Sequence, residues 1–169
     1  MPVTAEMTME EKRRLEEDLR EELVRRAIDQ RAVPTRDEAI IRDLMPGDLG
    51  AVTEVFTQIL AVPVAWNTTY TVTLTAKRLV GIYGIKNKSA VPLTTGIRFG
   101  LGAGPAKIKD QWEVESAWLE LNTESLTTQP IIYDKDSIIT IQQYAAAAGV
   151  DGVIYLGLVC EPAGDVVTH

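Results

Sequence analysis

The stretch Phe99–Lys107, FGLGAGPAK, is the part of the sequence that most resembles a ligand-binding motif, because three glycines precede a lysine. A phosphate-binding loop of the G-x-x-x-x-G-K-[ST] type needs a glycine before the lysine, a hydroxyl residue after it and a helix beyond. Here Ala106 precedes Lys107, and the residues that follow alternate in polarity as a strand does. We therefore predict a hairpin loop whose glycines supply positive φ angles. Its candidate contact residues are Gly100, Gly102, Gly104 and Lys107.

Acidic residues beside tryptophans are a second candidate for chemistry. Glu113 and Glu115 lie near Trp112 and Trp118, and paired carboxylates beside aromatic side chains are typical of glycosidase clefts. However, both glutamates share the strand face opposite to Trp112, which is typical of a solvated surface. Exposed tryptophans could also form a platform for sugar rings, but Trp66 and Trp112 stand in alternating apolar series. That placement predicts core side chains.

Nucleophiles and metal ligands are scarce. Cys160, the one cysteine, ends an apolar run and has no histidine in the body to act as its base, since the single histidine is His169. Asp134, Asp136 and Asp151 lie in predicted turns without the spacing of a calcium-binding loop. We therefore predict no catalytic, cofactor-binding or metal-binding residues. A binding or structural protein is expected rather than an enzyme.

The charge balance limits the partners. The chain of 169 residues has 17 basic and 24 acidic side chains and a net charge of −7. Proteins that bind nucleic acid or an anionic membrane surface need a basic surface, so neither partner is expected. No apolar stretch is long enough to cross a membrane, and no secretory signal pattern is visible. We expect a protein that is made and folded in a cytoplasm.

Charge is concentrated in the first part of the chain. Residues 1–50 carry 22 of the 41 charged side chains, whereas residues 51–169 carry the other 19 over more than twice the length. This change predicts a charged helical arm and linker over 1–50, followed by a β-rich domain over 51–169.

The arm has the pattern of a long helix. Thr8 and Glu11 have the spacing of a capping box, and Pro34 ends the helix. A narrow apolar stripe along one face consists of Leu15, Leu19, Leu23, Ala27 and Ile28. A free helix of this length is only marginally stable in water, so the stripe needs a cover. The cover is either the chain's own body or a neighbouring subunit, and the narrowness of the stripe favours the neighbour. A second capping-box spacing predicts a short helix over 36–45.

The body has the alternation of β-strands. Strands are predicted at 64–76, 78–86, 95–100, 107–118, 130–133, 137–143 and 152–160. The segment 51–62 fits a helix and a strand equally well. A parallel fold would need helices between the strands, and none is visible after residue 62. The predicted fold class is therefore mainly β, an antiparallel β-sandwich or jelly-roll-like barrel with an N-terminal α-helical arm.

Taken together, the arm at 8–31, the Thr-rich strand at 66–76 and the closing run at 133–162 resemble virion accessory proteins of tailed phages, of the capsid decoration (cement) type. The resemblance implies a non-enzymatic protein that forms a homo-oligomer, such as a trimer, and binds a major capsid or other virion protein. Its place would be the virion, assembled in the host cytoplasm. The alternative is a carbohydrate- or receptor-binding β-sandwich module, with tryptophans or the glycine loop at the ligand site.

Overall fold

The computed structural model describes residues 7–51, 57–74, 77–102, 107–114 and 121–165 of the chain. It is mainly β, with antiparallel sheets and one N-terminal helix, which confirms the coarse fold class that the sequence predicts. In chain order, the elements are α1 (Met9–Asp29), η1 (Arg36–Glu38), β1 (Ala39–Asp43), η2 (Pro46–Leu49), β2 (Thr57–Leu60), β3 (Ala65–Thr73), β4 (Leu79–Asn87), β5 (Thr94–Leu101), β6 (Lys107–Glu113), β7 (Glu124–Tyr133), β8 (Ile138–Ala145), β9 (Gly149–Pro162) and η4 (Ala163–Asp165). The η elements are short 3₁₀ turns.

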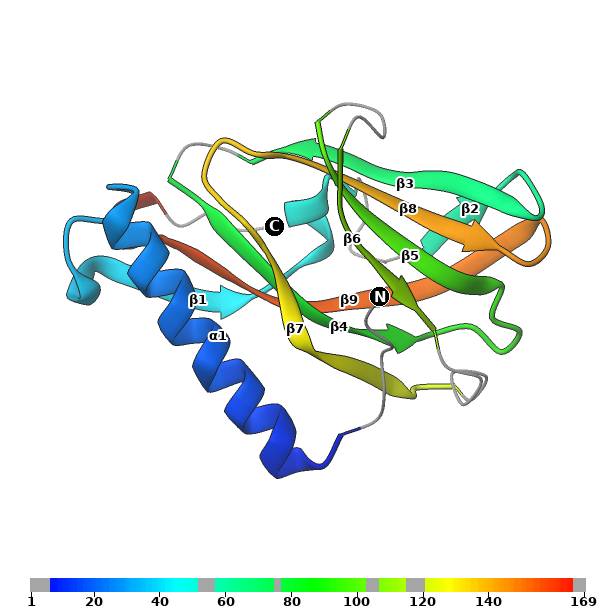
Figure 1. Cartoon of the computed structure of the whole chain (residues 1–169), viewed down its shortest axis with the longest axis horizontal. Helices are drawn as coiled ribbons and strands as arrows, with labels where there is room; N and C mark the ends of the chain where they lie inside the picture. The colour runs from blue at the N-terminus through cyan, green and yellow to red at the C-terminus, as the bar shows by residue number, and fades with distance from the viewer. Residues whose placement is uncertain (1–6, 52–56, 75–76, 103–106, 115–120, 166–169) are drawn as a thin grey trace.

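The strands form two antiparallel sheets, whose arrangement is shown in Figure 1. One sheet has the order β1-β9-β4-β7, with β2 also paired to β9, and the other has the order β3-β8-β5-β6. The pairs are nested: β1 and β2 pair with β9, β3 with β8, β4 with β7 and β5 with β6. The strands are therefore arranged as one long antiparallel hairpin that is folded over on itself.

The main apolar core draws side chains from both sheets. Tyr155 on β9 makes edge contacts with Tyr70 on β3 and Phe99 on β5, at centroid distances of 5.8 and 6.3 Å. Trp112 on β6 is fully buried and its ring lies 4.5 Å from that of Phe99, which confirms its predicted core position. Aromatic side chains bury large areas, so the contacts of Tyr155 with Tyr70 and Phe99 hold the two sheets together.

Helix α1 lies across the outer face of the sheet that contains β9 and β4 (Figure 1). The predicted capping box is confirmed, because Thr8 Oγ1 accepts a hydrogen bond from Glu11 N and the Glu11 carboxylate accepts one from Thr8 N. A second apolar cluster joins the helix to the sheet. Leu19 sits directly on Gly81 of β4, where a Cβ atom would lie 2.6 Å from Leu19 Cδ1. The missing side chain of Gly81 therefore lets the helix approach the strand closely.

Polar contacts also hold α1 on the sheet. Near its first turns, Glu16 accepts a hydrogen bond of 2.6 Å from the hydroxyl of Tyr83 on β4. At its other end, Asp134 accepts hydrogen bonds from Arg26 and Gln30. The predicted turn residue Asp134 thus anchors the helix and has a structural role.

The segment after the helix differs from the prediction. The helix expected over 36–45 is wrong, because only Arg36–Glu38 forms a helical turn and Ala39–Asp43 is β1, paired with β9. The adjacent β-branched residues Ile40 and Ile41 favour a strand, and this preference prevails once β9 offers an edge to pair with. Part of the segment that the expected boundary at residue 50 assigns to the arm therefore belongs to a sheet.

A buried ionic cluster fixes β1 and the turn that follows it. Arg42 donates two hydrogen bonds to Asp48, of 2.7 and 2.8 Å, and its Nε donates a third to Glu161 at 2.7 Å. Glu161 also accepts a hydrogen bond of 3.0 Å from Arg78 Nε. Asp48 and Glu161 are buried, so each carboxylate depends on its arginine partners for compensation of its charge.

Trp66 does not occupy the core position predicted for it. A β-bulge between Thr68 and Tyr70 of β3 shifts the alternation by one residue. Tyr70 faces the core, whereas Trp66 lies on the outer face of the sheet and is half-buried. There its ring contacts Tyr144 at a centroid distance of 5.3 Å and the guanidinium of Arg98 at 4.0 Å. The predicted alternation therefore applies only from Tyr70 onward.

Candidate functional site

The residues predicted as an arm interface do not form an exposed surface in this structure. All of them lie on α1 and belong to the apolar cluster between the helix and the chain's own sheet. Leu15, Leu19, Leu23 and Ala27 are buried there, and Ile28 packs beside them, partly buried. The cover is thus the chain's own body, which is one of the two alternatives that the sequence leaves open. A neighbouring subunit is not needed to shield the stripe.

The predicted hairpin is confirmed, because β5 and β6 pair on either side of the loop, while a contact role for the loop stays a prediction. Gly102 has a φ of +96°, as expected of a turn glycine, and its N–H donates to Ile138 O on β8. Gly100 is a buried residue of β5, and Lys107 is the exposed first residue of β6. Gly104 lies outside the described residues. The strand β6 begins at Lys107, where a phosphate-binding loop would need a helix.

A surface that the sequence reading missed lies at the end of the molecule away from α1. Three segments without a single charged residue meet there, and we call them the tip: residues 57–65, 89–94 and 145–150. Backbone hydrogen bonds join them, from Val64 N to Ala145 O and from Ala146 N to Leu93 O, each 2.8 Å long. In Figure 1 the tip lies at the right, where β2, the start of β3 and the end of β8 come together.

The tip exposes aliphatic side chains. Of the nine large apolar side chains that are exposed in the described part of the chain, five lie in the tip: Ile59, Val62, Val64, Val91 and Val150. Ile59 on β2 and Val150 on β9 are a cross-strand pair, with exposed fractions of 74% and 60%. Three alanines at 146–148 are exposed beside them. Clustered exposed apolar side chains mark interaction sites more often than single ones do.

Val64 adds backbone strain to this surface. Its φ is +50°, in the left-handed region, which is a true outlier for a β-branched residue. Its side chain is 69% exposed, so burial does not compensate the strain. Strain of this kind costs on the order of 1–3 kcal/mol and tends to occur at functional sites.

A buried network of hydrogen bonds holds part of the tip in place. The Asp151 carboxylate accepts hydrogen bonds from the N–H groups of Leu93 and Thr94 and from Thr94 Oγ1. Gln143 donates to the same hydroxyl at 2.7 Å and accepts a hydrogen bond of 2.8 Å from Tyr155. Burial raises the pKa of Tyr155 well above its ordinary value, so its hydroxyl stays protonated and keeps donating. The loop at 89–94 is therefore held in place by fully buried groups.

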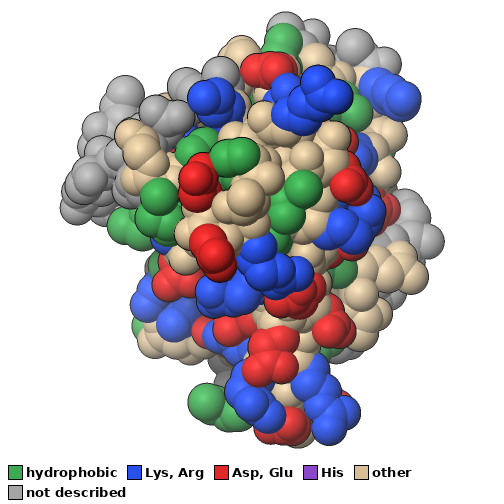
Figure 2. Space-filling model, turned by 90° about the vertical axis from the view of Figure 1, so that its left-hand side faces the viewer, with side chains coloured by type: hydrophobic (Ala, Val, Ile, Leu, Met, Phe, Trp, Pro, Cys, Tyr) green, Lys and Arg blue, Asp and Glu red, His purple; other side chains and the backbone are tan. Residues whose placement is uncertain are grey.

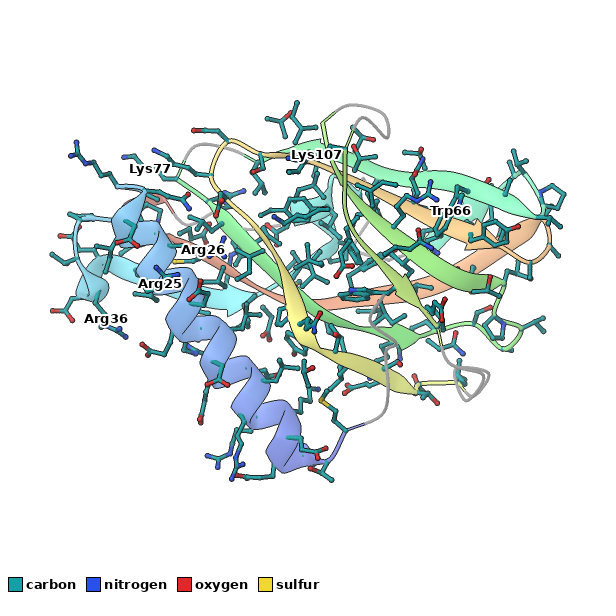
Figure 3. The ribbon with its side chains drawn as sticks, viewed as in Figure 1. Arg25, Arg26, Arg36, Trp66, Lys77 and Lys107 are labelled. Carbon is teal, nitrogen blue, oxygen red and sulfur yellow. The ribbon has the colours of Figure 1, made fainter. Side chains whose placement is uncertain are left out.

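The opposite end of the molecule is densely charged. Figure 2 looks at that end and shows acidic and basic side chains crowded together over it. Figure 3 shows Arg25, Arg26, Arg36 and Lys77 there, while Trp66 lies at the far end beside the tip. The charged end carries ion pairs, such as Arg36 with Glu21 at 2.7 Å. Charged and apolar surface are thus separated along the molecule. The charged side chains crowd around α1, and the apolar surface lies at the tip.

The other residues that the sequence singles out have structural surroundings. Cys160 is buried in the apolar cluster beneath α1, and this burial raises its pKa to about 11. Within the described ranges, no group of three or more His, Cys, Asp or Glu side chains is arranged to hold a metal ion. No helix in these ranges has the length and apolar character needed to cross a membrane.

No protein family matches the sequence, and no curated protein is detectably similar to it.

One signal in the sequence could have revealed the tip: residues 57–76 are twenty consecutive residues without a charge, in a chain where charged residues make up 24%.

Proposed function

We propose that the chain is a non-enzymatic structural protein of a virion, which assembles with copies of itself through the tip and thereby adds contacts on a capsid lattice. The observation that carries the proposal is the set of five exposed aliphatic side chains on a surface without charge. The centre of a protein interface is typically depleted in charge and rich in apolar side chains, as this surface is.

The distribution of charge allows a second copy to be the occupant of the tip. Two molecules of net charge −7 repel each other over most of their surface. The tip carries none of these charges, and the screening length in physiological salt is about 8 Å. Two copies can therefore meet tip to tip with little repulsion. The exposed alanines at 146–148 let backbones approach closely and enlarge the apolar area.

The strand order supports a virion role. Nested antiparallel pairs in two sheets of order β1-β9-β4-β7 and β3-β8-β5-β6 are what a rolled hairpin of eight strands produces. We assign this arrangement to the jelly-roll class of β-sandwich, with β1 and β2 as two parts of the first strand. Viral capsid domains are among the main users of that architecture.

The experiment that tests this function places a positive charge in the tip. Ile59→Lys and Val91→Lys come from different segments of the tip, and both side chains are more than two thirds exposed, so neither change disturbs the core. Each is expected to shift the solution mass measured by light scattering toward 18.6 kDa, the mass of one chain. Burying an unpaired ammonium in an interface is costly, so the loss of association should exceed tenfold.

The matched control is Ile108→Lys, which adds the same charge to an exposed isoleucine on β6, away from the tip. This variant should keep the assembly of the unaltered protein. Equal masses for all three variants and the unaltered chain would show that the tip is not the interface.

A further inference from the structure

A hollow on the outer face of the β3-β8-β5-β6 sheet lies beside Trp66. Trp66, Tyr144, Gly96 and Glu113 are consecutive in register across the four strands, so they form one row. Gly96 has no side chain, and the gap in the row opens a hollow of about 320 Å³. Its walls are Trp66 and Tyr144 on one side and Gln111 and Glu113 on the other.

The aromatic wall is held in position before any ligand arrives. The guanidinium of Arg98 lies 4.0 Å from the centre of the Trp66 ring, and Tyr144 meets the same ring edge-on. The ring also lies close to the floor, since a Cβ atom on Gly96 would be 3.2 Å from Trp66 Cη2. The bulge after Thr68 is what turns Trp66 to this face. A side chain fixed by such contacts loses little conformational entropy on binding.

We propose that this hollow binds a neutral pyranose unit of a glycan. One face of a pyranose ring consists of C–H groups, which pack on an aromatic ring, while its hydroxyl groups need hydrogen-bond partners at the rim. The hollow offers both, with Trp66 as the apolar wall and the Gln111 amide and Glu113 carboxylate as polar partners. Thr95 also lines the hollow.

The surrounding charges select a neutral sugar. Glu113 lies at the rim of the hollow, and the chain as a whole has a net charge of −7, so acidic sugars and phosphate esters are repelled. Arg98 keeps its positive charge, but its guanidinium lies against one face of the Trp66 ring, and Arg98 is not among the residues that line the hollow. This site goes beyond the proposed assembly role, because it would let the protein attach to a glycan-bearing surface.

The test is binding of the full chain to neutral glycans, screened on an array and then measured by titration calorimetry with methyl glycosides of glucose, galactose, mannose and N-acetylglucosamine. Trp66→Ala removes the apolar wall. Gly96→Ala keeps every lining side chain but fills the hollow or displaces the indole. Each change is expected to weaken binding of the preferred glycoside by about tenfold or more.

The control is Thr71→Ala, an exposed residue of β3 on the same face but two rows away from the hollow, which should leave binding unchanged. Urea unfolding of each variant separates loss of the site from loss of the fold. Ile59→Lys should keep glycan binding while it breaks assembly, so failure of one proposal is distinguishable from failure of the other. Binding to no neutral glycan, selective binding to peptides or acidic sugars, or equal binding by Trp66→Ala would overturn the proposal.

Discussion

At the scale of single residues, the backbone strain at Val64 lowers the stability of the fold, while its exposed side chain adds apolar surface to the tip. A valine at φ +50° is strained, and an asparagine is tolerated in that region far better. We expect Val64→Asn to raise the free energy of unfolding by about 1 kcal/mol, because the strain is relieved and the lost side chain was exposed. The same change should weaken self-association, because an apolar contact is replaced by an amide. Urea unfolding and solution mass measure the two effects on one sample.

The control for this prediction is Val62→Asn, at a tip residue that is 54% exposed and has no positive φ. It should weaken association in the same way without the gain in stability. If Val64→Asn proved less stable than the unaltered protein, the strain assigned to this residue would be refuted.

Residue positions were predictable only where the strand is regular. Trp112 follows the alternation of its strand and is in the core as predicted. Trp66 follows an alternation equally well in the sequence, but the bulge at Thr68–Tyr70 turns it to the outer face. A bulge depends on pairing with β8, and such long-range pairing is not visible in a single strand's sequence.

At the scale of elements, the position of α1 can be tested through the one cysteine. Cys160 lies in the apolar cluster under α1, and burial raises its pKa to about 11. At pH 8 the thiol is therefore protonated, and its reaction with a disulfide reagent should be slow, since the thiolate is the reactive form. Leu23→Glu places a charge in the buried face of α1 and should loosen the helix. We expect the labelling rate of Cys160 to rise by about tenfold or more.

Arg20→Glu is the matched control, because it introduces the same side chain on the exposed face of the same helix. Its labelling rate should stay close to that of the unaltered chain. Rapid labelling of the unaltered protein would mean that α1 does not cover its own sheet in solution, and the arm would again be free for a neighbour.

The strands of the body were predictable because their local pattern agrees with their final environment. The strands predicted at 78–86, 95–100 and 137–143 lie within one or two residues of β4, β5 and β8. The strand predicted at 130–133 covers only the end of β7. The first half of β7 was missed because it is rich in threonine and serine and has no clear apolar alternation. The cover of α1 could not be decided from its stripe alone. It depends on Gly81, a residue of another strand that makes room for Leu19.

At the scale of the whole molecule, the separation of charge predicts how salt affects assembly. The proposed contact is apolar and uncharged, so it contains no ion pairs that salt would weaken. Salt screens the repulsion between the remaining acidic surfaces of two copies. We expect association to strengthen as sodium chloride rises from 0.05 to 0.5 M, and sedimentation velocity at fixed protein concentration measures it. Weaker association at high salt would indicate an interface built from charges instead.

The sequence carries only one signal for the tip, and that signal is not sufficient to locate it. Each of its three segments looks like an ordinary apolar stretch next to a strand, and such stretches usually enter a core. Only the nested pairing brings them to one end and leaves Ile59 and Val150 on the outside. The lack of charge from 57 to 76 was visible, but its meaning depends on what lies beside it in space.

The most direct test of self-assembly through the tip is the solution mass of the unaltered chain, measured by sedimentation equilibrium over a range of protein concentrations at physiological salt. The proposed function predicts a mass that is a whole multiple of 18.6 kDa, approached as concentration rises and lost in Ile59→Lys. A mass of 18.6 kDa at every concentration, identical in the variant, would contradict it.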